Sequence, residues 1–162
     1  MELNKFNNLL ELFSFQFNQQ DSKNFFLRSL KNKENIFSWQ ETLDCIQKLS
    51  YELSLNLEKN DRCLLISENR PEWLISDLAI MLANGVTVPA YTTYTERDYQ
   101  YLINDCKPTV IIVSDQSQYK KINRIVKKNN FIKLIITFDD IKSEYQKTIN
   151  LKKIFDKDYY VK

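Results

Sequence analysis

The sequence contains one glycine and no histidine. Average usage of about 7% would give roughly 11 glycines in a chain of this length. Phosphate-binding loops of the GxGxxG or GxxxxGK type need several glycines, so this sequence cannot build either. The absence of histidine excludes Ser-His-Asp and Cys-His catalysis, the Cys2His2 zinc site and a histidine proton shuttle. The most common catalytic and phosphate-binding devices are therefore missing.

Long apolar runs and a charge excess are also missing. The longest apolar stretches, such as Leu78–Ala83 and Val110–Val113, are far shorter than the ~20 residues of a membrane helix. The N-terminus has only Lys5 before Phe6 and is interrupted by polar residues, unlike a signal peptide. Lys and Arg number 23 against 21 Asp and Glu, a balance that predicts no nucleic-acid partner.

The three cysteines, Cys45, Cys63 and Cys106, form no CxxC pair and leave one residue over. This favours buried apolar cysteines in a reducing compartment over disulfides or a metal site. We therefore expect a cytoplasmic protein with no bound metal.

What is present is the composition of a globular domain, with 43% hydrophobic residues. Apolar residues at helical spacing predict a helix within residues 1–24, and a second helix of about four turns from Trp39 to Leu57. Between them, residues 25–30 and 35–38 flank a polar turn at 31–34 and are typical of a hairpin.

From residue 61 onward, short apolar strands alternate with amphipathic helices. The strands are predicted at 62–67, 86–91, 109–113 and 132–138. Asn69 as a cap and Pro71 in the first turn predict the start of the first intervening helix, and Gly85 is expected as its left-handed C-cap. Three strand–helix–strand units predict an α/β fold with a parallel sheet and helices on both faces.

Ligands of such sheets gather at the carboxyl ends of the strands. One of these ends carries five consecutive hydroxyl side chains, Tyr91, Thr92, Thr93, Tyr94 and Thr95. The first four are our candidates for the edge of a substrate cleft. The alternative is a loop that satisfies its own backbone and caps the next helix, since Thr95 with Asp98 is typical of a capping box.

Two other patterns admit a functional and a structural interpretation. Glu68 and Asp115 follow the first and third strands, as acidic residues do in receiver domains, but such acids are also common at helix N-termini. The further acids and the lysine of a receiver pocket cannot be placed. A basic helix face is interpreted as solvated rather than as a site for nucleotides or anionic lipid; its members are Lys120, Lys121, Arg124, Lys127 and Lys128.

Residues 61–95 resemble the N-terminal segment of the adenylate-forming acyl-CoA synthetases. In that family a strand and helix reading "DRV.I.S.NRPEW" precede a strand reading "GGV.VP.Y.T.T", and here Asp61–Trp73 and Gly85–Tyr91 follow this pattern. The Pro-Ala-Tyr-Thr-Thr-Tyr-Thr version is similar to the long-chain fatty acid–CoA ligase branch. The match is dense over 61–115, looser over 25–60 and thin beyond 116. The resemblance gives a structural role to seven residues: Asn69, Arg70, Pro71, Glu72, Trp73, Gly85 and Pro89.

The resemblance implies a ligase that uses ATP, Mg²⁺ and coenzyme A, forming an acyl-adenylate before the thioester. The family's Ser/Thr/Gly-rich loop ending in Pro-Lys-Gly, its later nucleotide-binding motifs and its catalytic lysine have no counterpart here, so no catalytic residue is assigned. We expect residues 1–24 to form an N-terminal helical segment and 25–162 an incomplete AMP-binding domain, inactive alone. Its partner would be the remainder of the ligase, with fatty acid as substrate and peripheral membrane contact. A sheet face left uncovered is a further expectation. The alternative is a stand-alone α/β binding or regulatory module.

Overall fold

A five-stranded parallel sheet forms the centre of the molecule in the computed structural model, which describes residues 5–29 and 36–158. Its strand order is β4-β3-β5-β6-β7. In register, Leu64 of β3 lies opposite Val88 of β4 and Ile111 of β5. The strands are β3 (Arg62–Ile66), β4 (Val86–Ala90), β5 (Val110–Val113), β6 (Leu134–Thr137) and β7 (Thr148–Asn150). The predicted parallel sheet is confirmed.

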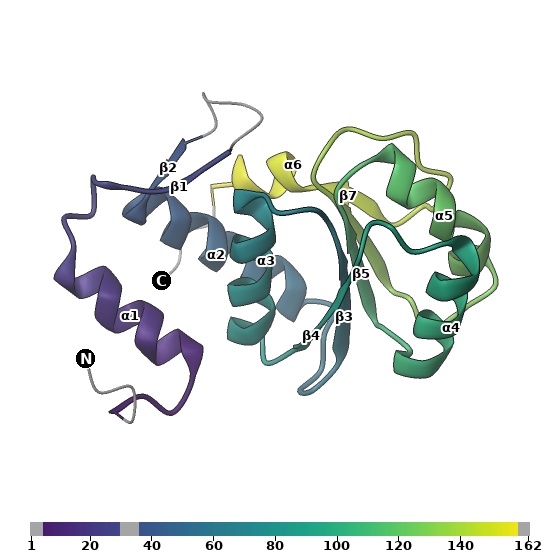
Figure 1. Cartoon of the computed structure of the whole chain (residues 1–162), viewed down its shortest axis with the longest axis horizontal. Helices are drawn as coiled ribbons and strands as arrows, with labels where there is room; N and C mark the ends of the chain where they lie inside the picture. The colour runs from purple at the N-terminus through teal and green to yellow at the C-terminus, as the bar shows by residue number, and fades with distance from the viewer. Residues whose placement is uncertain (1–4, 30–35, 159–162) are drawn as a thin grey trace.

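Helices cover both faces of this sheet (Figure 1). On one face, Cys63 and Leu65 pack against α2 (Trp39–Ser54), α3 (Pro71–Leu82) and α6 (Leu151–Phe155). On the other face, Leu64 and Ile66 pack against α4 (Glu96–Cys106) and α5 (Gln116–Lys127). Successive strand residues point to opposite faces, so the run Cys63–Ile66 contributes side chains to both hydrophobic cores. The expectation of an uncovered sheet face is therefore wrong.

The N-terminal elements lie beside α2 and α3, away from the sheet (Figure 1). Helix α1 (Leu9–Gln19) precedes the antiparallel pair β1 (Phe25–Arg28) and β2 (Ile36–Ser38), which confirms the predicted helix and hairpin. Aromatic rings join them to α2, with Phe26 stacked on Trp39 at 3.8 Å between ring centroids and Phe13 at 5.9 Å from Trp39. The turn predicted at 31–34 lies outside the described residues.

The start of α3 differs from the prediction. Pro71 occupies the first helical position as expected, but the N-cap is Arg70, and its side chain makes no capping hydrogen bond. Asn69 therefore does not cap the helix. The Arg70 guanidinium instead pairs with the carboxylate of Glu72 in the first turn, where the helix dipole favours a negative charge.

The end of α3 also differs. Asn84, not Gly85, takes the left-handed backbone conformation, with φ of 60°, and Gly85 has no positive φ. Asparagine tolerates this conformation better than most residues. Gly85 is needed for space instead: a Cβ atom built there would lie 3.0 Å from Ile80 Cγ2 and 3.1 Å from Leu57 Cδ1. The predicted C-cap role of Gly85 is therefore wrong, and its missing side chain is the reason it fits.

Sequence periodicity missed β7 and α6, which have three and five residues. Segments this short contain too few positions to display a period of 2 or 3.6. Among residues 5–29 and 36–158, no helix combines the length and the apolar character needed to span a bilayer.

Candidate functional site

A pocket of about 420 Å³ opens at the carboxyl ends of β3 and β4. Ser67, Glu68 and Asn69 line it from the β3 side, Trp73 from α3, and residues 89–93 from β4 and the loop that follows. This volume is within the range of small-molecule sites. The sheet topology brings together the two segments that carry the sequence motifs, although they are about 20 residues apart in the chain.

Three of the four candidate cleft residues line this pocket: Tyr91, Thr92 and Thr93. Tyr94 does not. Its ring packs edge-on against Tyr91, at 5.6 Å between centroids, and against Tyr99 at 5.9 Å. Tyr94 thus supports the loop from behind.

The main chain of residues 91–94 is held by side chains from two helices. Lys121 Nζ of α5 donates to the carbonyl oxygens of Thr92 at 2.6 Å and Tyr94 at 3.0 Å. The Tyr99 hydroxyl of α4 donates to the carbonyl of Tyr91 at 2.7 Å. Burial raises the pKa of Tyr99 to about 12, so this hydroxyl keeps its proton even above the ordinary tyrosine pKa of about 10. The prediction that Lys121 belongs to a solvated basic face is therefore wrong.

Thr95 has the capping role that the alternative interpretation gave it. Its hydroxyl accepts from the backbone N–H of Asp98, and the Asp98 carboxylate accepts from the backbone N–H of Thr95 at 2.9 Å. The hydrogen bonds from the Thr95 hydroxyl and backbone hold the pKa of Asp98 below its ordinary value. The hydroxyl-rich segment thus divides into pocket-lining residues and a helix cap.

Arg70 connects the pocket-forming turn to a distant strand end. Its Nη2 lies 3.1 Å from Glu72 Oε1, its Nη1 lies 3.0 Å from Asp139 Oδ1, and its guanidinium carbon lies 5.3 Å from the ring centroid of Phe138. Burial opposes the charge, but hydrogen bonds to Glu72 and Asp139 outweigh it and raise the pKa of Arg70. The Arg70–Asp139 contact had no sequence signal, because 69 residues separate the partners.

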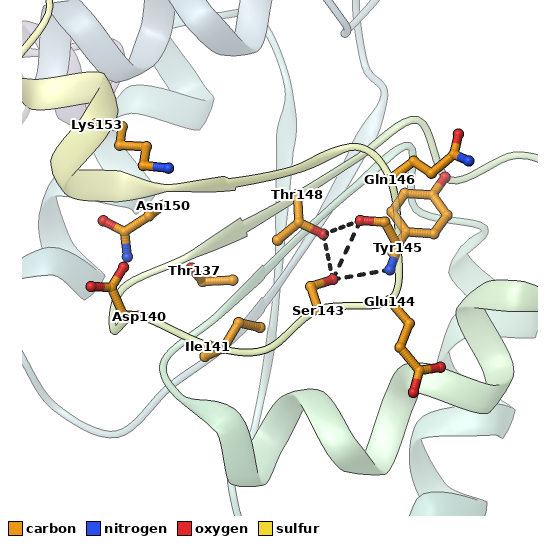
Figure 2. A pocket seen from close by; sticks show the side chains of 10 residues that line it. All are labelled: Thr137, Asp140, Ile141, Ser143, Glu144, Tyr145, Gln146, Thr148, Asn150 and Lys153. Carbon is orange, nitrogen blue, oxygen red and sulfur yellow. Dashed lines mark hydrogen bonds between the residues drawn. The ribbon is translucent and has the colours of Figure 1, made fainter.

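A second pocket, of about 400 Å³, lies beside the loop that connects β6 to β7 (Figure 2). Figure 2 shows Ser143 hydrogen-bonded to Thr148 and Tyr145 within this lining. Ser143 Oγ lies 2.7 Å from Thr148 Oγ1 and accepts from the backbone N–H of Tyr145 at 3.1 Å. These hydroxyls satisfy one another and the loop backbone. We interpret this pocket as a consequence of loop packing, and none of the candidate site residues lies in it.

Of the two acidic residues singled out in the sequence, Glu68 lines the pocket and Asp115 has a structural role. Asp115 accepts from the backbone N–H of Gln118 and caps α5. Burial raises the pKa values of Cys45 and Cys63 to about 12, which makes them poor nucleophiles. Cys63 is buried as predicted, whereas Cys45 and Cys106 are partly exposed. Over the described ranges, no three Cys, Asp or Glu side chains are grouped to hold a metal ion.

The sequence model of the family described as "AMP-binding enzyme" matches residues 14–158. The chain belongs to this family. The resemblance to adenylate-forming enzymes is thereby confirmed, and a receiver-like fold is not supported. The family match and the curated relatives support an AMP-forming ligase family.

Curated relatives of this AMP-binding chain are fatty acid–CoA ligases. It is 32% identical over 88 residues to the long-chain-fatty-acid–CoA ligase ACSBG1 of Rattus norvegicus, covering 54% of this chain and 12% of the relative. It is 30% identical over 89 residues to fatty acyl-CoA synthetase A of Dictyostelium discoideum, covering 55% and 13%. The matched segment thus covers about an eighth of the length of these relatives.

Solved structures of two ligases share the fold. The anthranilate CoA ligase AuaEII in complex with anthranoyl-AMP superposes with a TM-score of 0.81 at 15% identity, over 96% of this chain and 29% of that one. A mutant form of coronafacic acid ligase from Pectobacterium brasiliense also gives 0.81, at 20% identity, over 96% and 30%. At these identities the likeness establishes the fold of the AMP-binding chain, including the parallel sheet with helices on both faces.

Proposed function

We propose that this chain is part of a fatty acid–CoA ligase and that Tyr91, Thr92 and Thr93 form one edge of its substrate cleft, with Tyr94 behind them. The observation that carries the proposal is the pocket at the ends of β3 and β4. It joins an apolar wall of Trp73 and Pro89 to a rim of hydroxyl groups. Similarity to long-chain fatty acid–CoA ligases over about half of the chain supports fatty acids as the substrate class.

The reaction has two steps. ATP and a fatty acid give an acyl-adenylate and pyrophosphate, and the coenzyme A thiol then displaces AMP to form the thioester. With one glycine in the chain, and no cluster of metal-ligating side chains among residues 5–29 and 36–158, the residues present do not fit ATP phosphates or Mg²⁺. We assign ATP, Mg²⁺ and coenzyme A binding to the remainder of the ligase, which is the chain's partner.

The seven motif residues then act as scaffold for the cleft. Arg70, Glu72 and Pro71 fix the start of α3, which places Asn69 and Trp73 at the pocket. On the opposite side, Pro89 and the close approach at Gly85 shape β4. We propose a cytoplasmic ligase with peripheral membrane contact, in which residues 1–24 precede the AMP-binding domain at 25–162.

Pyrophosphate exchange with ATP and palmitate tests whether the chemistry needs the remainder of the ligase. We expect no exchange with the 162-residue chain and measurable exchange with the complete gene product that contains it. Exchange by the chain alone would overturn the assignment of the chemistry to the remainder of the ligase. Lack of acyl-CoA formation by the complete gene product, at any fatty acid chain length, would overturn the ligase itself.

Two tyrosines of similar exposure test the cleft edge. Tyr91 is 72% exposed and lines the pocket, whereas Tyr101 is 74% exposed on α4 and does not line it. In the complete gene product, we expect Tyr91→Ala to raise the KM for palmitate and Tyr101→Ala to leave it unchanged. Equal effects of the two substitutions would contradict the position of the cleft.

A further inference from the structure

We infer that Lys121 and Tyr99 are positioning residues that fix the backbone of residues 91–94 at the mouth of the pocket. The inference rests on the proposed function in one respect, that this loop edges the substrate cleft. The contacts themselves do not depend on it. Neither residue lines the pocket, so each acts on a ligand only through the loop.

The two side chains together hold three of the four loop carbonyls. Lys121 Nζ donates to Thr92 O at 2.6 Å and Tyr94 O at 3.0 Å, and the Tyr99 hydroxyl donates to Tyr91 O at 2.7 Å. Hydrogen bonds from a charged donor are stronger than those between neutral groups. Residues 91–94 have left the sheet, so these carbonyls obtain no partner from a neighbouring strand, and side chains from α4 and α5 replace the ladder.

We call Lys121 and Tyr99 together the clamp, and they contact each other between α4 and α5. Tyr99 is fully buried, and its hydroxyl also lies 3.1 Å from the side-chain oxygen of Gln118, one turn before Lys121 on α5. Lys121 Nζ lies 5.8 Å from the centroid of the Tyr99 ring, within the range of a cation–π interaction. The two donors therefore support each other as well as the loop.

A backbone hydrogen bond within residues 91–94 provides a measure of whether the clamp is in place. The N–H of Tyr94 donates to Tyr91 O at 3.2 Å, the same carbonyl that Tyr99 holds. The neighbouring N–H of Thr95 is held by the Asp98 carboxylate at 2.9 Å and belongs to the cap of α4. Loss of the clamp should expose the first amide to exchange and leave the second protected.

The test measures hydrogen exchange at single residues in the complete gene product, with Lys121→Met compared against Lys120→Met. Lys120 is the adjacent, exposed residue on the same basic helix, so the two variants lose the same charge. We expect exchange at Tyr94 to become about tenfold faster in Lys121→Met, with Thr95 unchanged, and neither to change in Lys120→Met. Lys121→Arg should restore protection, because a guanidinium donates to two carbonyls.

The same preparations separate this inference from the proposed function. With saturating ATP and coenzyme A, we expect Lys121→Met to raise the KM for palmitate about fivefold and to change kcat less than about twofold, with recovery in Lys121→Arg. Equal exchange at Tyr94 in Lys121→Met and Lys120→Met would overturn the positioning role. Faster exchange with an unchanged KM in an active ligase would retain the clamp and overturn the cleft assignment. Tyr99→Phe provides a second variant and should accelerate the same amide.

Discussion

Replacing Gly85 with alanine tests why the chain keeps its only glycine at the junction of α3 and β4. The added Cβ would lie 3.0 Å from Ile80 Cγ2, 3.1 Å from Leu57 Cδ1 and 3.2 Å from the carbonyl oxygen of Ile80. Carbon atoms in contact normally lie about 3.5–4.0 Å apart. Leu57 can move the end of its side chain, but the Ile80 contacts include the helix backbone, so the junction itself must shift.

The size of the effect follows from two opposing terms. Inserting a methyl group into a packed site costs about 1–3 kcal/mol. Replacing glycine with alanine also removes freedom from the unfolded chain, which stabilises the fold by about 0.4–1 kcal/mol when the backbone conformation is compatible. Gly85 has no positive φ, so the second term applies in full. We therefore expect Gly85→Ala to lower the free energy of unfolding by about 1–2 kcal/mol.

Urea denaturation followed by circular dichroism measures this change. Removing the Ile80 side chain should relieve part of the clash, so Gly85→Ala should cost at least about 0.5 kcal/mol less in an Ile80→Ala background. The matched controls are at Asn84, whose φ of 60° carries the backbone strain. There, Asn84→Ala should cost about 1 kcal/mol, and Asn84→Gly should cost little. A Gly85→Ala variant as stable as the parent, or a cost independent of Ile80, would refute the steric explanation.

Three further predictions concern stability. Arg70→Met should cost about 2 kcal/mol in urea denaturation, and Arg70→Lys should recover less than half, because lysine lacks the fork that reaches both Glu72 and Asp139; full recovery would argue against the fork. Thr95→Ala should lower the melting temperature by an amount equivalent to about 1 kcal/mol, and Thr95→Ser should not. Burial raises the pKa of Cys63 to about 12, so the folded protein keeps a proton that the unfolded chain releases above about pH 9. Stability should therefore fall by about 1.4 kcal/mol per pH unit from this thiol between pH 9 and 12, and Cys63→Ala should remove that part of the slope.

The fold over residues 62–138 was predictable because three of its four strands are apolar runs and its helices carry apolar residues at helical spacing. The first residues of the helices were harder to predict. The Thr95–Asp98 capping box was predicted correctly from local spacing, whereas the expected cap at Asn69 failed because Arg70 engages Glu72 instead. Local sequence favours several caps at once, and tertiary partners decide between them.

The position of the pocket was partly predictable and its support was not. Hydroxyl residues after a strand indicate the carboxyl edge of the sheet, and Tyr91–Thr93 do line a pocket there. Nothing local shows that Lys121, among several basic residues, turns toward that loop, since 27 residues separate it from Tyr94. A charge pattern records which face of a helix is polar, and it carries no information about which charge meets a carbonyl.

The sheet order explains why the pocket opens between β3 and β4. In this order the connections reverse direction between β3 and β5, the place where ligands of such sheets usually bind. Here the Ser114 N–H donates to Ile66 O at 2.9 Å, which extends the hydrogen-bond ladder between β3 and β5 one residue past the strand ends. Beyond β4, in contrast, Tyr91 O accepts from Tyr99 of α4. After β4, the loop therefore turns away from the segment that follows β3. The pocket is the space between these two segments. Lys121 and Tyr99 thus hold the loop that forms the β4 side of the pocket.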